Sequence, residues 1–385
     1  MIPHANRVLE LRDSIFGEMT KLAKEYNAIN LSQGFSEEVV APELKKYFCE
    51  AINEDFNQYA PFTGMPQLIK SVIEYNKKLY DISFDDNNVT ITNGATEAIF
   101  LIFQSIIDPG DEVLLFEPFY DSYHTSIKFC GGKPVCSTLS YPGFELNFEE
   151  LEKLVNPKTK AIIFNNPHNP SGKVFSESDL LNLIKFAQRY NLYLISDEVY
   201  EFLIFDNNRF IPIQSLQNCY ENKKIISISS ASKTFDATGW KVGWLIADES
   251  LNKLIRRVHQ YVTFSVSTPA QIAISRAFIN FDSYIQGFIN RYQKKLNMIC
   301  QLLDDIDFEY VRPQGTYFLI GNIKNQSIKS YDLALKLVKE YQLALIPMES
   351  FYDRSNEGET LIRFCFAKKD ETIISAIKQL GLGLK

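Results

Sequence analysis

The sequence predicts an α/β fold built on a mostly parallel, seven-stranded sheet, with a second, smaller α+β domain. Short runs of β-branched residues alternate with amphipathic helical windows through the middle of the chain. Several of these runs are apolar throughout, as strands covered on both faces must be. After about residue 285 the pattern changes to one long helical window, followed by the runs TYFLIGNI and LIRFCFAKK, which is typical of a smaller α+β unit.

The alternating pattern repeats a strand, a helix and a strand. We expect strands at residues 88–92, 111–116, 133–139, 160–165, 192–197, 224–230 and 242–247. Ser176 and Asp179 form a capping-box signature before the helix that follows the fourth strand. The apolar stretch 98–107 is too short to cross a membrane and is expected to be a buried helix. We place the large domain at 46–285 and assign 1–45 and 286–385 to the small domain.

Composition argues against several classes of partner. The 385 residues carry 40 Lys and Arg against 47 Asp and Glu, a net charge of −7, with both signs mixed along the chain. We therefore expect a small-molecule ligand, and neither nucleic acid nor a membrane as partner. The six cysteines show no metal-binding or disulfide spacing, and the N-terminus has no signal-peptide pattern. These features predict reduced cysteines, no metal and a cytoplasmic location.

Unusual residues follow the predicted strands, where an open parallel sheet binds its ligands. After the first strand, Gly94 permits a tight turn, and the NH groups of Ala95 and Thr96 begin a helix, which is a natural phosphate site. Asp197 ends the fifth strand, where an unpaired carboxylate in apolar surroundings needs a cationic partner. Lys233 follows the sixth strand, at the mouth of the same crevice.

Each of these signals alone has an ordinary structural explanation. A glycine between a strand and a helix is usually a turn, and most lysines lie on the surface. Asn169, in the loop NNPHNPSG after the fourth strand, either stiffens a turn or offers an amide to a ligand. Together, a lysine amine, a buried aspartate and a helix N-terminus are what pyridoxal phosphate needs for its Schiff base, its ring nitrogen and its phosphate.

The motifs NPHNPSG, SDEVY, SKTF with TGWKVGW, and RFCFAKK follow one another along the chain in this order. Asp197 lies 28 positions after Asn169, and Lys233 lies 36 positions after Asp197. In these motifs, and along essentially its whole length, the chain resembles the fold type I, pyridoxal-phosphate-dependent aminotransferases of class I/II. The stretches INLSQGF, NQYAPFTG, EPFYDSY and VHQYVTFSVSTPAQ resemble the branch of bacterial methionine aminotransferases, kynurenine aminotransferase and glutamine transaminase K.

The resemblance implies pyridoxal 5'-phosphate as cofactor and a role for each matching residue. Lys233 would carry the cofactor as a Schiff base and shuttle the proton, and Asp197 would keep its ring nitrogen protonated. Tyr200 and Asn169 would bind the phenolate oxygen, and Tyr120 would stack on the ring. The implied phosphate site consists of Gly94, Ala95, Thr96, Ser230, Ser232 and Lys241, with Tyr59 reaching in from a neighbouring subunit.

The resemblance also implies a substrate site shared across a homodimer. Arg363 would bind the α-carboxylate with two parallel hydrogen bonds, aided by the Gly34 NH and Asn169. The implied side-chain pocket consists of Phe16, Phe35 and, from the partner chain, Phe264. The substrates would be an amino acid and a 2-oxo acid.

We therefore expect a ping-pong aminotransferase for apolar or aromatic L-amino acids, with methionine favoured. The alternatives are a carbon–sulfur β-lyase acting on cystathionine or cysteine conjugates, and a transaminase that prefers kynurenine or glutamine. A non-enzymatic regulator would need a DNA-binding module, and the segment before the first motifs is neither basic nor patterned like a helix-turn-helix. Two departures leave the substrate open: QGFSEE stands where relatives commonly have QGFPDF, and Thr96 stands where kynurenine-using animal relatives tend to carry an aromatic residue.

Overall fold

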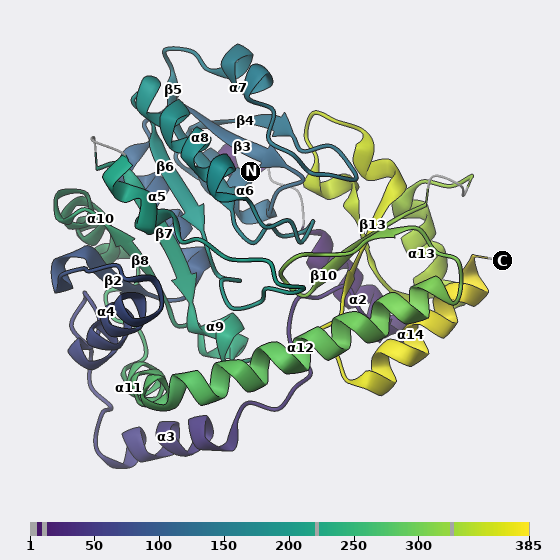
Figure 1. Cartoon of the computed structure of the whole chain (residues 1–385), viewed down its shortest axis with the longest axis horizontal. Helices are drawn as coiled ribbons and strands as arrows, with labels where there is room; N and C mark the ends of the chain where they lie inside the picture. The colour runs from purple at the N-terminus through teal and green to yellow at the C-terminus, as the bar shows by residue number, and fades with distance from the viewer. Residues whose placement is uncertain (1–5, 10–13, 220–222, 324–326, 385) are drawn as a thin grey trace, which may run out of the picture.

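A seven-stranded sheet forms the centre of the molecule in the computed structural model, which describes residues 6–9, 14–219, 223–323 and 327–384 (Figure 1). Its strands are β2 (Val89–Thr92), β3 (Glu112–Glu117), β4 (Lys133–Thr138), β5 (Thr159–Asn165), β6 (Tyr193–Asp197), β7 (Ile225–Ser230) and β8 (Gly243–Ala247). Their order is β2-β8-β7-β6-β5-β3-β4, and β8 runs antiparallel to the other six. All seven predicted strands are present, with ends within one residue of those predicted, and the mostly parallel sheet is confirmed.

Helices cover both faces of this sheet, which explains why several of its strands are apolar throughout. Val113 and Leu115 of β3 pack on one face in a cluster with residues of α5, whereas Leu114 and Phe116 pack in the cluster on the other face. The helices of this part are α3 (Pro42–Asn53), α4 (Pro66–Tyr80), α5 (Ala95–Ile106), α6 (Asp121–Phe129), α7 (Phe148–Leu154), α8 (Glu177–Arg189), α9 (Ala231–Thr234), α10 (Glu249–Val262) and α11 (Thr268–Ala277). The buried helix expected at 98–107 is α5, and α8 begins with the predicted capping box.

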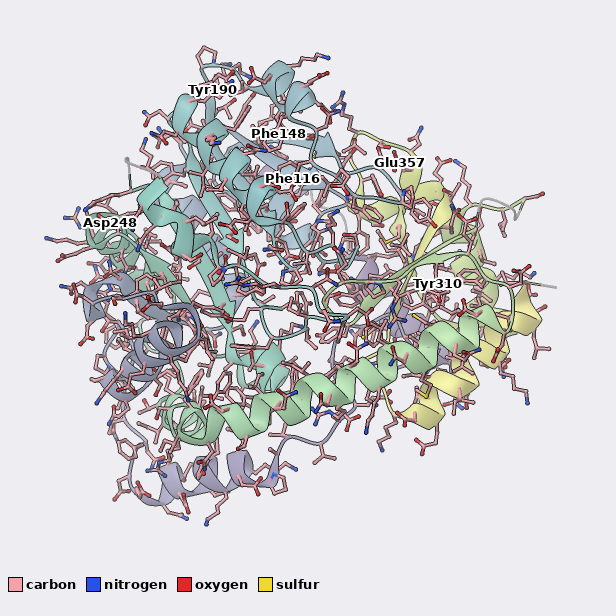
Figure 2. All side chains as sticks on the ribbon, in the orientation of Figure 1. Phe116, Phe148, Tyr190, Asp248, Tyr310 and Glu357 are labelled. Atoms are coloured by element: carbon pink, nitrogen blue, oxygen red, sulfur yellow. The ribbon has the colours of Figure 1, made fainter. Side chains whose placement is uncertain are left out.

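The C-terminal part is a second, antiparallel sheet with helices beside it. The order of this sheet is β12-β13-β10-β9. Its elements are α12 (Phe281–Asp304), β9 (Tyr310–Val311), β10 (Phe318–Asn322), α13 (Ser330–Glu340), β12 (Ile346–Pro347), β13 (Leu361–Cys365) and α14 (Asp370–Gly383). Figure 2 shows the side chains that fill both parts, with Phe116 in the large sheet and Tyr310 beside α12.

Most of the N-terminal segment lies against this C-terminal part. α2 (Ile15–Glu25) packs there, and β1 (Ile29–Asn30) pairs in parallel with β11 (Leu343–Ala344), whereas α1 (Asn6–Leu9) contacts α6 beside the large sheet. α12 runs without a break through the predicted domain boundary at residue 285 (Figure 1). The exact domain limits stay a prediction. No helix in the described ranges is both long and apolar enough to cross a membrane.

The strand register brings separate carboxyl ends together. Thr92 at the end of β2 and Ser230 at the end of β7 both pair with Gly243, the first residue of β8. A side chain at Gly243 would put its Cβ 2.8 Å from the carbonyl carbon of Gly94, so a glycine is needed there. Asp197 at the end of β6 lies between β5 and β7, and the sheet thus collects the predicted site residues at one edge.

Candidate active site

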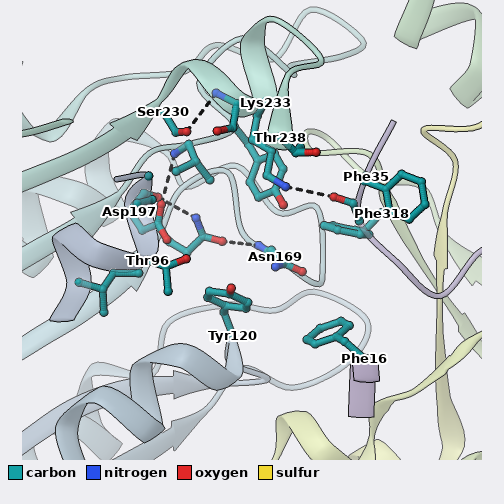
Figure 3. Close-up of a pocket in the computed structure, with 18 of the residues that line it drawn as sticks. Phe16, Phe35, Thr96, Tyr120, Asn169, Asp197, Ser230, Lys233, Thr238 and Phe318 are labelled. Carbon is teal, nitrogen blue, oxygen red and sulfur yellow. Dashed lines mark hydrogen bonds between the residues drawn. The ribbon is translucent and has the colours of Figure 1, made fainter. Parts of the chain in front are cut away.

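A cavity of about 390 Å³ opens at this edge, between the large sheet, the N-terminal segment and the antiparallel sheet (Figure 3). Fifteen of the predicted site residues line it: Phe16, Gly34, Phe35, Gly94, Ala95, Thr96, Tyr120, Asn169, Asp197, Tyr200, Ser230, Ser232, Lys233, Lys241 and Arg363. Tyr59 and Phe264 do not line the cavity of their own chain. They lie against each other on the surface, with ring centroids 5.5 Å apart and exposed fractions of 83% and 47%.

Lys233 projects from the short helix α9 into the cavity. Its Nζ donates hydrogen bonds to the Gly34 carbonyl at 3.1 Å and the Tyr317 hydroxyl at 2.8 Å. Burial lowers the pKa of this amine to about 8. Near neutral pH the lysine is therefore neutral, and hence nucleophilic, much more often than a solvated lysine is.

Asp197 is a buried carboxylate held by neutral donors. The Tyr123 hydroxyl donates to its Oδ2 at 2.6 Å and the Val199 NH to its Oδ1 at 3.3 Å. Burial raises the pKa of this carboxyl to about 6, an effect that the two hydrogen bonds and the charge of Lys233 only partly offset. The carboxylate therefore favours a cation brought in by a ligand.

The N-terminus of α5 forms the anion-binding end of the cavity. Gly94 precedes the helix with a φ of +77° and has no side chain to cap it, so the first NH groups remain available. A Cβ on Gly94 would lie 3.2 Å from the Lys241 Nζ, so that ammonium reaches over the same turn. On the other side, the Ser230 hydroxyl donates to the Val242 carbonyl at 3.1 Å and accepts the Ser232 NH at 3.1 Å.

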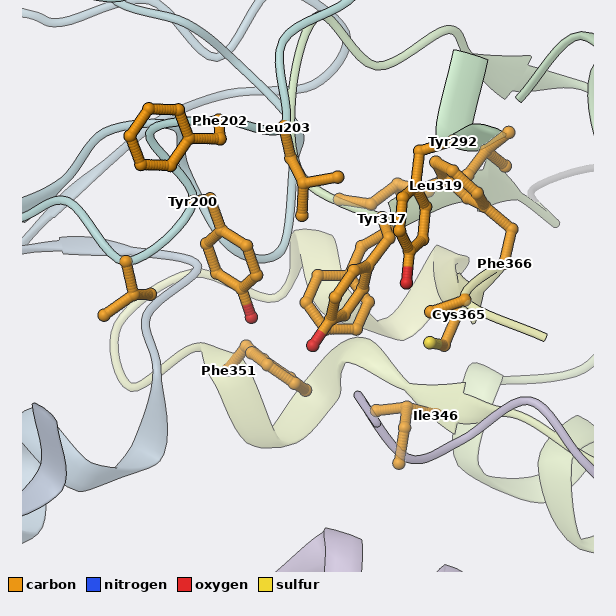
Figure 4. Packing of buried hydrophobic residues seen from close by; sticks show 14 of the residues in the cluster. Tyr200, Phe202, Leu203, Tyr292, Tyr317, Leu319, Ile346, Phe351, Cys365 and Phe366 are labelled. Carbon is orange, nitrogen blue, oxygen red and sulfur yellow. The ribbon is translucent and has the colours of Figure 1, made fainter. Parts of the chain in front are cut away.

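Aromatic rings form much of the remaining wall. Tyr120 lies across the cavity from Lys233, and burial raises the pKa of its hydroxyl to about 12 (Figure 3). Burial raises the pKa of Tyr200 still further. The Tyr200 ring packs edge-on against Tyr317 and Phe318, with centroids 5.4 and 5.9 Å apart, and Figure 4 shows its hydroxyl beside that of Tyr317. The hydroxyl groups of Tyr120 and Tyr200 therefore stay protonated at neutral pH, and each can donate a hydrogen bond to a ligand.

Arg363, on β13, is the buried cation at the other end. It is 1% exposed, and its η-nitrogens donate to the Asn169 side-chain oxygen at 2.9 Å and the Ser32 carbonyl at 3.0 Å. Its guanidinium carbon lies 3.9 Å from the centre of the Phe318 ring, and its Nε has no hydrogen-bond partner among the described residues. Burial lowers the pKa of Arg363 to about 10. A guanidinium in this position can pair with the carboxylate of a ligand.

Several residues that contact the predicted site were not identified from the sequence, among them Tyr123, Asn165 and Tyr317. Tyr123 lies one helical turn after Tyr120 on α6, so helical spacing could have indicated it. Asn165 ends β5, where its side-chain amide donates to the Asp197 carbonyl at 2.7 Å. It could have been inferred, because it ends a predicted strand in the same way as Asp197. No sequence signal indicated Tyr317, which is brought to Lys233 from a position 84 residues later in the chain.

Comparison with known proteins identifies the family. Residues 26–380 match the family described as Aminotransferase class I and II. The methionine aminotransferase of Escherichia coli (strain K12) is 33% identical over 382 residues, which cover 99% of this chain and 98% of that protein. Human kynurenine–oxoglutarate transaminase 3 is 33% identical over 407 residues, covering 97% of this chain and 88% of that protein. The structure of N-succinyldiaminopimelate aminotransferase from Mycobacterium tuberculosis aligns with a TM-score of 0.94 and 33% identity, covering 99% of this chain and 100% of that one.

The cavity fits the cofactor of this family, pyridoxal 5'-phosphate. It offers an amine of lowered pKa, a buried carboxylate hydrogen-bonded to neutral donors and an uncapped helix N-terminus, which suit the aldehyde, the ring nitrogen and the phosphate. When bound, this cofactor supplies an electron-withdrawing ring that stabilises negative charge at the substrate's α-carbon. The aminotransferase activity expected from the sequence is confirmed by these relatives. The chain belongs to the class I and II aminotransferases.

Proposed function

We propose that this aminotransferase moves the amino group of an apolar or aromatic L-amino acid, with methionine preferred, to a 2-oxo acid. The observation that carries the proposal is the environment of Arg363, whose guanidinium lies against the rings of Phe16 and Phe318. An α-carboxylate bound to Arg363 would leave the donor's side chain among these rings and Phe35. An acidic side chain would need another cation, whereas the two described lysines that line the cavity, Lys233 and Lys241, belong to the amine and phosphate ends.

The predicted site residues divide the work in this proposal. Lys233 would bind the cofactor and would move the proton at the donor's α-carbon. Asp197, fixed by Tyr123, would keep the ring nitrogen protonated. Tyr200 and Asn169 would donate hydrogen bonds to the ring oxygen, and Tyr120 would pack on the ring. Ser230, Ser232, Lys241 and the turn at Gly94, Ala95 and Thr96 would hold the phosphate, while the Gly34 NH and Asn169 would also assist Arg363.

A half-reaction titration tests the donor preference. The holoenzyme is mixed with methionine, phenylalanine, glutamine, kynurenine or aspartate, without an acceptor, and the absorbance of the bound cofactor is followed. We expect methionine and phenylalanine to convert the cofactor to its amine form about 10- to 100-fold faster than aspartate does. Conversion by aspartate alone, or by none of these donors, would contradict the proposal. Pyruvate released from cystathionine without a 2-oxo acid would instead indicate a β-lyase.

We also propose a cytoplasmic homodimer that shares its active sites. Tyr59 and Phe264 support this, because they are exposed, pack together and lie outside the cavity of their own chain. Tyr261, 86% exposed, and Val262, 47% exposed, extend the same apolar surface at the end of α10. In the dimer, Tyr59 of the partner subunit would reach the phosphate and the partner's Phe264 would close the side-chain pocket.

Hybrid dimers test the shared site. In a shared site, Lys233 comes from one chain and Tyr59 from the other. A hybrid dimer of one Lys233→Ala chain and one Tyr59→Ala chain would therefore contain one site with both residues intact. We expect unfolding and refolding of the mixed variants to restore roughly a quarter of the wild-type activity. Activity that stays at the mean of the two separate variants would contradict sharing. Fractionation of the source cells, with the enzyme assayed in each fraction, tests the cytoplasmic location.

A further inference from the structure

Lys368 is a fully buried lysine that contacts one residue of the side-chain pocket in two ways. It follows β13 and is 0% exposed. Its Nζ donates a hydrogen bond to the Phe35 carbonyl at 3.1 Å and lies 3.9 Å from the centre of the Phe35 ring. The backbone and the ring of Phe35 are therefore held by the same ammonium group.

The segment that carries Phe35, residues 34–38, is also fixed to the start of α14. The Glu37 NH donates to the Ala367 carbonyl at 3.0 Å. The Glu37 Oε2 accepts the Lys369 NH at 3.1 Å and the Thr372 hydroxyl at 2.9 Å, and its Oε1 lies 3.9 Å from the Lys368 Nζ. Segment 34–38 is thus held on both sides of Lys368.

A second buried lysine, Lys295 on α12, completes this arrangement. It is 5% exposed, and its Nζ contacts the Glu38 carboxylate at 2.8 Å and the Asp370 carboxylate at 3.0 Å. The same Nζ donates to the backbone carbonyl of Lys368 at 2.6 Å. Lys295 therefore connects the segment 34–38 to the backbone that positions Lys368. Glu37 and Glu38 belong to the stretch QGFSEE, which departs from the family's usual QGFPDF.

Burial of an ammonium group is costly unless its interactions compensate. An apolar side chain could fill the same space under Phe35, but it could not bind the Phe35 carbonyl or attract the face of the ring. We propose that Lys368 is a positioning residue that sets the Phe35 ring in the side-chain pocket and thereby determines the preference for bulky apolar donors. This inference rests on the proposed function, because it gives Phe35 a contact with the donor's side chain.

The variant Lys368→Met removes the charge and keeps an unbranched side chain of similar length. We expect kcat/KM to fall about tenfold for phenylalanine and methionine, mainly through KM, and to change less than about twofold for alanine, whose methyl group does not reach the ring. Lys368→Arg, which keeps a cation, should recover part of the loss. Phe35→Ala should lower the same two values, and the double variant should lose no more than Phe35→Ala alone.

The matched control is Lys329→Met, which removes an exposed lysine that pairs with Glu359 at 2.7 Å. It should leave every donor's kcat/KM unchanged. If Lys368→Met does not fold, as judged by circular dichroism, Glu37→Gln tests the same arrangement from a partly exposed position. We then expect about a threefold loss for phenylalanine and none for alanine.

Equal losses for alanine and phenylalanine, or additive losses in the double variant, would overturn the positioning role. If Lys368→Met does not fold, an unchanged ratio of phenylalanine to alanine activity in Glu37→Gln would overturn it as well. A wild-type enzyme without a preference for apolar donors would contradict the proposed function instead. The coupling between Lys368 and Phe35 would still be measurable with whichever donor the wild type accepts best.

Discussion

Replacement of Lys233 by alanine is expected to lower kcat for transamination by about 10²- to 10⁴-fold, which is the usual range for a positioned acid–base group. The reason is its location. The amine is buried, has a pKa lowered to about 8, and lies 5.6 Å from the centre of the Tyr200 ring and 5.4 Å from that of Tyr317, in the cavity that Asp197 also lines. Alanine can neither hold the cofactor covalently nor move a proton at the donor's α-carbon.

The measurement is the steady-state rate with methionine and a 2-oxo acid, after the cofactor content has been equalised by dialysis against pyridoxal 5'-phosphate. Lys158→Ala is the control, because Lys158 is exposed and lies in the turn before β5. That variant should match the wild type. A Lys233→Ala enzyme that turned over amino acids at the wild-type rate would remove the catalytic role assigned to this lysine.

Asp197→Asn is expected to weaken cofactor binding by roughly 150- to 5,000-fold, the equivalent of the roughly 3 to 5 kcal/mol lost when one partner of a buried charge pair is removed. Asparagine is almost the same size and can still accept the Tyr123 hydrogen bond. It cannot, however, stabilise a protonated ring nitrogen. We therefore expect the loss to come from the missing charge, since the packing stays nearly the same.

Equilibrium titration of the unloaded enzyme with cofactor, followed by absorbance, measures this effect. Because the Asp197 carboxyl has a pKa of about 6 before a cation arrives, it becomes neutral below that pH. The cofactor affinity of the wild type should therefore fall as the pH drops below about 6, and this pH-dependent loss of affinity should be absent in Asp197→Asn. Asp332→Asn, at an exposed position, is the control. Equal affinity of Asp197→Asn and the wild type at pH 7.5 would contradict the assignment.

The sheet and the cofactor end of the cavity could be predicted because both follow from local patterns. Strands buried on two faces are apolar throughout, and in a parallel sheet the residues after their carboxyl ends meet at one edge. Gly94, Asp197 and Lys233 are unusual for their positions along the chain, and the strand register brings them together.

Other parts of the site could not be predicted, because they depend on contacts between distant segments. Lys368 and Phe35 are 333 positions apart, and nothing near either residue indicates that one holds the other. Tyr317 could not be predicted for the same reason, because its hydroxyl reaches Lys233 and the Gly34 carbonyl only when three separate segments have packed together. The long helix α12 shows the same limit for domain boundaries, because no turn or linker marks residue 285.

Reduction of the holoenzyme with borohydride, followed by mass mapping of its peptides, tests most directly whether Lys233 carries the cofactor. Borohydride makes the linkage between the lysine and the cofactor permanent, so the modified peptide identifies the residue. We expect the pyridoxyl group on the peptide that contains Lys233, and no such peptide when an excess of methionine has first converted the cofactor to its free amine form. A pyridoxyl group on a different lysine, or none on any, would contradict the role of Lys233 on which the proposed mechanism depends.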